Sequence, residues 1–106
     1  MPETIDSESA RFSDAVFELV RRTACELPED VRSALEAAAA NEEPGSTAAL
    51  VLSLYLKNVD MAKEIWKPAC QDTGMPIFYV RHPGYVTKRK LMPIFQDVLA
   101  RATRET

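Results

Sequence analysis

Prolines and glycines interrupt this sequence at a few well-separated places, and these breaks limit what it can fold into. The clearest breaks lie at Pro28, Pro44-Gly45, Pro68 and Pro83-Gly84. Proline cannot continue a helix from its interior, and a proline–glycine pair favours a turn. We therefore expect the helices to lie between these breaks.

Apolar residues recur at three- and four-residue steps between these breaks, which predicts about four helices. The first runs from Arg11 to about Leu27, and the second from Pro28 to about Asn41. The third begins with Ser46 or Thr47 as N-cap and ends at Pro68. The last follows a basic run, residues 88–90, and contains Pro93, which either starts it or kinks it. The residues expected to face a core are Phe12, Val16, Leu19, Val20, Thr23, Leu27, Val31, Leu35, Ala38, Leu50, Val51, Leu54, Tyr55, Ala62, Ile65, Trp66, Leu91, Ile94, Phe95, Val98 and Leu99.

Two segments depart from this helical pattern. Residues 77–80, Ile-Phe-Tyr-Val, are β-branched and aromatic and predict one short strand, which needs a partner strand. Residues 1–10 are polar and acidic, so we expect a disordered leader. The remaining residues, 11–106, are expected to form a single, mostly helical domain.

Length and charge exclude several classes of function. With 106 residues the chain has room for one small domain. A formal net charge of −3 gives no basic footprint for nucleic acid. We find no apolar stretch of the roughly 18–20 residues that a membrane span needs, and no pattern typical of a signal peptide at the start. The expected compartment is the cytoplasm, where Cys25 and Cys70 stay reduced.

Polar and reactive side chains are concentrated in the run Cys70-Gln71-Asp72-Thr73-Gly74-Met75-Pro76. A thiolate is a soft ligand for zinc or iron–sulfur clusters, and a neighbouring amide and carboxylate can hold a polar substrate. Gly74 permits either an unusual backbone conformation or a close approach of another group. The chemistry alone leaves alternatives open, because a lone cysteine is often structural and Gln71 and Asp72 could simply satisfy a loop.

The same run, continued by residues 75–80, resembles the cluster-binding segment of class I, iron–sulfur-dependent fumarate hydratases and L-tartrate dehydratases. The resemblance extends upstream to residues 24–31 and 67–70, which are similar to the α-subunit type of these enzymes. It covers roughly residues 12–103 and only the opening part of the cluster-bearing domain.

This resemblance implies a role for three residues. In that family three cysteines hold a [4Fe-4S] cluster whose open iron binds the substrate hydroxyl and carboxylate. By position, Cys70 would be the first cluster ligand, and Gln71 and Asp72 would hydrogen-bond a small dicarboxylate. The other cysteines, the basic clamp and the catalytic base would come from outside this chain, which is expected to be a subunit or a fragment of the enzyme. This incomplete piece of a larger domain is expected to be inactive alone.

Other residues favour plainer interpretations. Cys25 is expected to pack within a helix, His82 to lie in a surface turn, and residues 88–90 to be a solvated face. A non-enzymatic helical interaction module is the alternative function, and a redox or zinc protein using both cysteines is a further one. Aromatic side chains available to dock a partner, or to fill a core, are Tyr55, Trp66, Phe78 and Tyr79.

Overall fold

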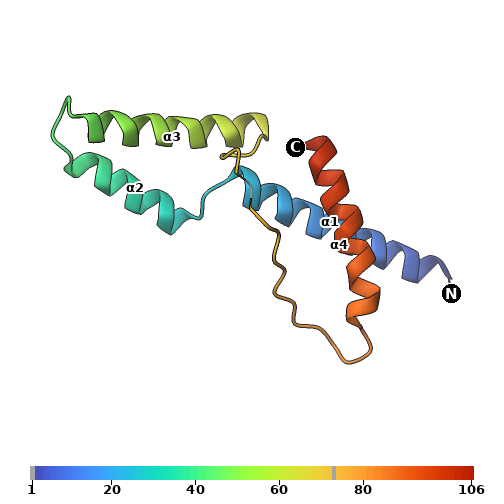
Figure 1. The fold of residues 1–106 in the computed structure, drawn as a ribbon. Coiled ribbons are helices and arrows are strands. Elements are labelled where there is room, and N and C mark those ends of the chain that lie inside the picture. The colour runs from blue at the N-terminus through green and yellow to red at the C-terminus, as the bar shows by residue number, and fades with distance from the viewer. Residues whose placement is uncertain (1, 73) are drawn as a thin grey trace. The chain divides into compact units, whose positions relative to one another are not determined.

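The computed structural model describes residues 2–72 and 74–106, with side chains described from Glu8 onward. The chain is mostly helical, as the periodicity predicts. It divides into two compact units, one formed by residues 1–22 and 72–106 and the other by residues 23–71. Both lie within what the sequence predicts as one helical domain. The helices are α1 (Pro2–Cys25), α2 (Glu29–Asn41), α3 (Thr47–Ile65) and α4 (Lys88–Glu105) (Figure 1).

Helix α1 begins earlier than expected. The sequence predicted a disordered leader over residues 1–10, whereas the helix starts at Pro2. Proline fits the first turn of a helix, where its missing N–H needs no partner. Once later turns are anchored, each added residue gains a backbone hydrogen bond, so polar residues can extend the helix.

The starts of α3 and α4 are fixed by capping side chains. Ser46 accepts a 3.1 Å hydrogen bond from the backbone N–H of Ala49, and Thr87 accepts one of 3.3 Å from Lys90. Each bond satisfies a donor that the first turn leaves without a partner. Pro93 lies inside α4 rather than at its start.

The core of the first unit joins α1 to α4. Val16 and Phe17 pack with a stripe of α4 that recurs at three- and four-residue steps, as expected for a helix with one buried face. Arg101 of α4 adds a 2.8 Å ion pair with Asp14 and places its guanidinium 3.9 Å from the ring centre of Phe17. The α4 members of this core are Leu91, Phe95, Val98 and Ala102.

The second unit is a hairpin of α2 and α3 that follows the last turn of α1. Figure 1 shows the two helices side by side, running in opposite directions. Val59 and Ala62 of α3 are buried, and Cys25 at the end of α1 is fully buried. No described side chain of α2 is buried, so the prediction that Val31 faces a core is wrong: it is 42% exposed.

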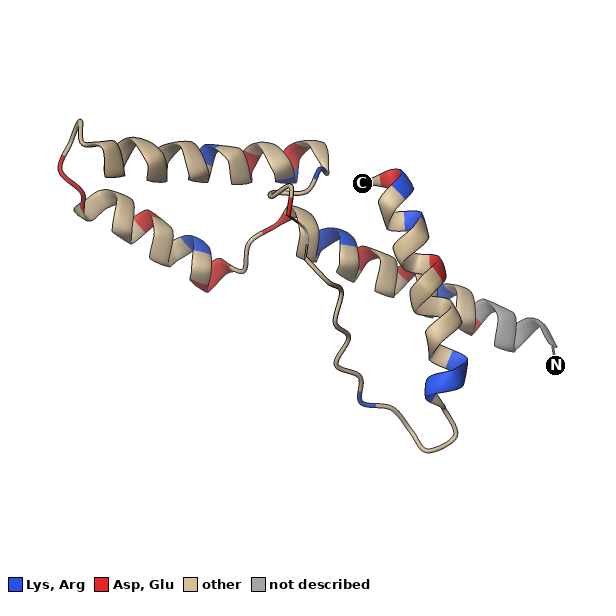
Figure 2. Cartoon of the chain, viewed as in Figure 1, with Lys and Arg blue, Asp and Glu red and all other residues tan. Residues whose placement is uncertain are grey.

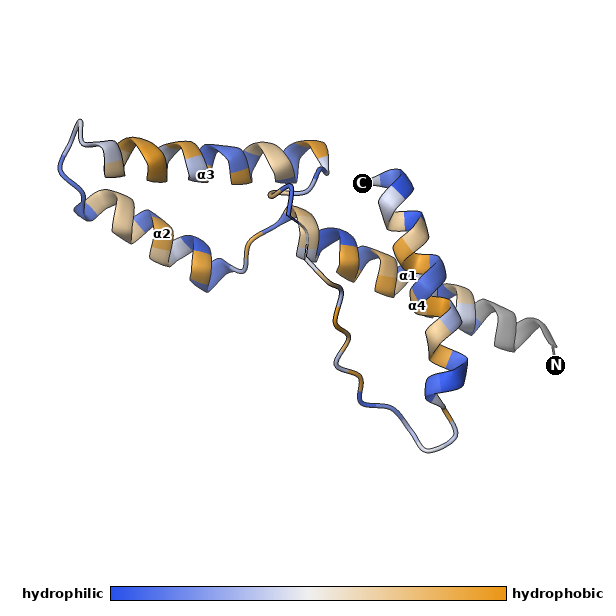
Figure 3. Cartoon of the chain, viewed as in Figure 1, coloured by the Kyte–Doolittle hydropathy of each residue, from blue (hydrophilic) through white to orange (hydrophobic). Residues whose placement is uncertain are grey.

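The outer face of α3 is the largest departure from the expected core. Four side chains on it, which we call the α3 stripe, are more than half exposed: Leu50, Leu54, Met61 and Ile65. Figure 3 shows apolar colouring along this helix. Of the α3 residues expected to be buried, only Ala62 is. Periodicity predicted the helix, but it cannot identify which polypeptide covers each face.

The predicted strand at residues 77–80 is wrong for this chain alone. No strand is present among residues 2–72 and 74–106, and residues 77–80 run as an extended segment (Figure 1). A strand is defined by backbone pairing with a neighbour, and β-branched composition cannot provide that neighbour.

Candidate functional site

The loop that carries Cys70 begins with a sharp change of direction at the end of α3. Trp66, a non-glycine residue, adopts the left-handed conformation with φ of 52° and ψ of 50°. The backbone N–H of Lys67 donates a 3.0 Å bond to the carbonyl of Ala62. This is a common way for a helix to satisfy its last carbonyls, and Pro68 then prevents the helix from resuming.

Two hydrogen bonds hold the residue immediately before Cys70. The backbone N–H of Ala69 donates a 2.9 Å bond to the carbonyl of Ala24 in α1. Its carbonyl accepts a 2.8 Å bond from the side-chain amide of Asn58 in α3. Ala69 is therefore anchored through both of its backbone polar groups, to two different helices of the second unit.

The two cysteines occupy opposite environments. Cys70 is exposed, whereas Cys25 is fully buried. The packing interpretation of Cys25 is confirmed. An exposed thiol on an anchored loop can meet an external ligand, and a buried thiol cannot take part without local opening. This difference in exposure argues against a metal or redox site built from both.

Gln71 and Asp72 follow directly and are also exposed. Gln71 ends the second unit and Asp72 opens the returning part of the first. Thr73 lies outside the described residues. Gly74 has φ of 68°, and no atom lies within 4 Å of the position that a Cβ would take. Of the two reasons for a glycine here, the backbone conformation is the one that the structure supports.

Within the described residues, the side chains can provide one exposed thiolate ligand to an iron–sulfur cluster, that of Cys70. No group of three or more His, Cys, Asp or Glu side chains gathers in a metal-binding arrangement within the described part of the chain. A [4Fe-4S] cluster is held mainly by cysteine thiolates, and Cys70 is the exposed one here. We therefore derive no reaction step through a cluster from this chain by itself.

Two other predicted features occur as expected. His82 is exposed, and its Nδ1 lies 2.9 Å from the carbonyl of Pro83. The turn that follows is closed by a 3.0 Å bond from the N–H of Val86 to the same carbonyl. The basic residues 88–90 are exposed at the start of α4 (Figure 2).

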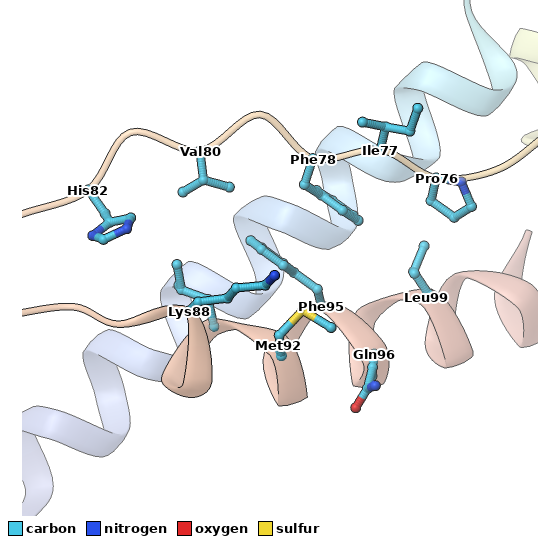
Figure 4. Close-up of a pocket in the computed structure, with 11 residues that line it drawn as sticks. Pro76, Ile77, Phe78, Val80, His82, Lys88, Met92, Phe95, Gln96 and Leu99 are labelled. Carbon is cyan, nitrogen blue, oxygen red and sulfur yellow. The ribbon is translucent and has the colours of Figure 1, made fainter.

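A pocket of about 520 Å³ lies between residues 76–82 and α4 (Figure 4). Phe78 forms part of its wall, and its ring stacks on Phe95 with centroids 4.4 Å apart and planes 1° from parallel. Apolar groups dominate, with Lys88, His82 and Gln96 adding polar atoms. This mostly apolar lining suits an apolar chain segment better than a dicarboxylate.

The second unit also carries an ion-pair network between α2 and α3. Arg32 lies 2.7 Å from Asp60 and 2.9 Å from Glu36. The hydrogen bond from Arg32 lowers the pKa of the Asp60 carboxyl, and partial desolvation opposes it. Asp60 and Glu36 are exposed and Arg32 is half-buried, so the network links α2 to α3 with a modest contribution to stability.

Sequence reasoning missed Asn58. It lies on an apolar helix, eleven residues before its partner, and nothing in its spacing identifies it. Its neighbours Lys57 and Asp60 are polar as well, so no pattern in the sequence distinguishes Asn58.

None of the helices within the described residues is long and apolar enough to cross a membrane.

Comparison with known proteins gives one consistent family. The sequence profile described as "Fumarate hydratase (Fumerase)" matches residues 13–106. A Geobacillus stearothermophilus protein named "Putative fumarate hydratase class I" is 33% identical over 95 residues, which cover 90% of this chain and 18% of that protein. A Methanocaldococcus jannaschii protein named "Putative L(+)-tartrate dehydratase subunit alpha" is 35% identical over 98 residues, which cover 90% of this chain and 34% of that protein. The chain thus spans about a fifth of one relative's length and about a third of the other's. No solved structure matches it.

Proposed function

This chain belongs to the fumarate hydratase (fumerase) family, and we propose that it is one part of an iron–sulfur hydro-lyase. The enzyme would add or remove water on a small dicarboxylic hydroxy-acid, fumarate/malate or L-tartrate. We place it in the cytoplasm, where a reducing environment keeps Cys70 a thiol. Because the chain spans 18% and 34% of these two relatives, most of the enzyme lies outside these 106 residues.

One observation carries this proposal: Cys70 is exposed on a loop whose preceding residue is held at both backbone groups. A cluster ligand must be accessible to the metal and held in place, and this thiol meets both needs. Gln71 and Asp72 are exposed beside it in sequence, where an amide and a carboxylate would hydrogen-bond the substrate. When bound, the cluster supplies a Lewis acid that polarises the substrate oxygen.

The test is assembly with the polypeptide from the same locus that carries the family's other cysteines, which we call the completing polypeptide. Co-expression followed by pull-down should give a brown complex with an iron–sulfur absorption band and hydratase or dehydratase activity. The isolated chain should bind no stable cluster and show no activity. An intact [4Fe-4S] spectrum from this chain alone would contradict the proposal.

The α3 stripe favours a second candidate, a helical interaction module without metal. Exposed apolar side chains on one helix face are typical of a surface that another chain covers. The same pull-down separates the two functions. A colourless complex that keeps its composition when Cys70 is replaced by serine would favour the interaction module.

A further inference from the structure

Residues 76–82 have the side-chain alternation of a β-strand, although they pair with no other backbone within the described part of the chain. Figure 4 shows Phe78 and Val80 directed toward α4 and Ile77 directed away from it. Tyr79, the next residue with the same parity as Ile77, is 93% exposed. Side chains that alternate in direction with a period of two are typical of a β-strand with one face packed against a core.

This segment is fixed on one face. The ring of Phe78 stacks on Phe95 at a centroid distance of 4.4 Å, and Phe95 belongs to the buried core of the same unit. The extended segment is therefore anchored to the core through Phe78, while Val80, which is directed to the same side, stays 44% exposed.

The backbone of the segment remains available for pairing. Across the described residues, no backbone–backbone hydrogen bond involves residues 75–82, and the next one begins at the turn where Val86 donates to Pro83. An extended segment in this state presents alternate N–H and C=O groups along each of its two edges. Another extended backbone is the chemical group that complements such an edge.

The composition argues against a loop that is simply solvated. Ile77 is 68% exposed and Tyr79 is 93% exposed, although isoleucine and tyrosine are among the residues enriched in strands and packed surfaces. Exposed loops are usually built from small and polar residues. A strand added beside this segment would satisfy its backbone and bring further polypeptide over both side chains.

We propose that residues 76–82 are an open edge to which a β-strand of the completing polypeptide adds. This rests on the proposed function, because that function requires the completing polypeptide. This occupant is favoured because the relatives are much longer than this chain, which spans 18% and 34% of them, so the completing polypeptide has ample length for such a strand. A second copy of this chain is a poorer occupant, because two strands alone are marginally stable and would leave Ile77 and Tyr79 uncovered.

Amide hydrogen exchange on the assembled complex tests the proposal. In the isolated chain, the amides of residues 77–81 should exchange at nearly unprotected rates. In the complex, alternate amides should slow by about a hundredfold or more, either 77, 79 and 81 or 78 and 80, because successive residues face opposite edges.

Two proline variants then test the backbone directly. Proline removes one ladder donor while keeping an extended conformation. Exactly one of Tyr79→Pro and Val80→Pro should weaken the complex by about tenfold, and it should be the one whose amide is protected. The other serves as its matched control. Tyr79→Thr keeps the N–H and loses only the ring, so it should weaken the complex less than the proline variant that removes a protected amide.

The outcomes separate this proposal from the proposed function. A brown complex with unprotected amides at residues 77–81, or equal losses from both proline variants, would overturn the strand proposal and leave the enzyme assignment standing. Failure to form any complex would remove both. Protection that grows with the concentration of the isolated chain would identify a second copy as the occupant and overturn our choice.

Discussion

Asn58 and Ala69, eleven residues apart, are joined by a 2.8 Å hydrogen bond from the side-chain amide of the first to the carbonyl of the second. Ala69 also donates to Ala24, so the residue before Cys70 is held by α3 and by the end of α1. The position of Cys70, the candidate cluster ligand, therefore depends on Asn58, which has no proposed role as a ligand or in catalysis. This dependence can be measured.

Replacing Asn58 by aspartate should loosen the loop. The carboxylate has nearly the shape of the amide but cannot donate to the Ala69 carbonyl, and helix propensity changes little. We expect a loss of about 1 kcal/mol in the free energy of unfolding and faster amide exchange at Ala69. Asn41→Asp makes the same chemical change at the exposed end of α2 and should leave Ala69 exchange as it is. Unchanged exchange in Asn58→Asp would mean that Ala24 alone anchors the loop.

The two thiols should differ sharply in reactivity. In the folded chain, iodoacetamide should modify exposed Cys70 more than about ten times faster than buried Cys25, because Cys25 reacts only after local opening. Mass spectrometry of timed samples measures both rates, and in denaturant they should converge. Similar rates in the folded chain would show that Cys25 is not enclosed in solution.

Cys70→Ser should leave the isolated chain intact and abolish the brown colour of the complex. The side chain is exposed, so the free energy of unfolding should change by less than about 0.5 kcal/mol. Serine oxygen is a poor substitute for a thiolate toward iron. The measurements are thermal unfolding of the chain and the absorption spectrum of the complex. A Cys70→Ser complex with full cluster content would exclude Cys70 as a ligand.

Phe95→Ala should unfold much of the first unit. Phe95 is 9% exposed and stacks on Phe78, and truncating a buried phenylalanine costs about 3–5 kcal/mol. Circular dichroism and amide exchange in α4 report the loss. Tyr79→Ala removes an aromatic ring that is 93% exposed and should change the free energy of unfolding by less than about 0.5 kcal/mol. Equal effects from the two variants would contradict the core described for this unit.

Acid should weaken the α2–α3 hairpin through Asp60. The hydrogen bond from Arg32 lowers the pKa of Asp60 in the folded state below its ordinary value of 3.8. The pair therefore stabilises the hairpin fully above that value, and its contribution disappears as the pH falls through the lowered pKa. Thermal midpoints measured from pH 6 downward should fall less steeply in Arg32→Gln than in the parent. Parallel pH profiles would show that this pair does not act on stability.

The helices could be predicted because their cause is local. Ser46 capping α3 and Pro68 preventing its continuation are properties of a few neighbouring residues. The buried face of α4 likewise follows from spacing alone, as Leu91 and Phe95 show. What was predicted correctly depends on interactions within a turn or two of helix.

The errors have a common physical origin in non-local contacts. The segment at residues 77–80 has the composition of a strand, but a strand exists only with its neighbour. Leu50 and Ile65 have the hydrophobicity of core residues, yet their exposures of 58% and 59% show that this chain does not cover them. The bond between Asn58 and Ala69 depends on how α3 and the following loop fold together, which no periodicity encodes. The roles of Gln71 and Asp72 stay predictions.

The α3 stripe has a consequence for how cells must produce this polypeptide. Exposed hydrophobic side chains such as Leu54 and Met61 are the kind of surface that chaperones bind. The same surface promotes aggregation when a polypeptide is present without its partner. Under the proposed function, synthesis together with the completing polypeptide would cover the α3 stripe and limit aggregation.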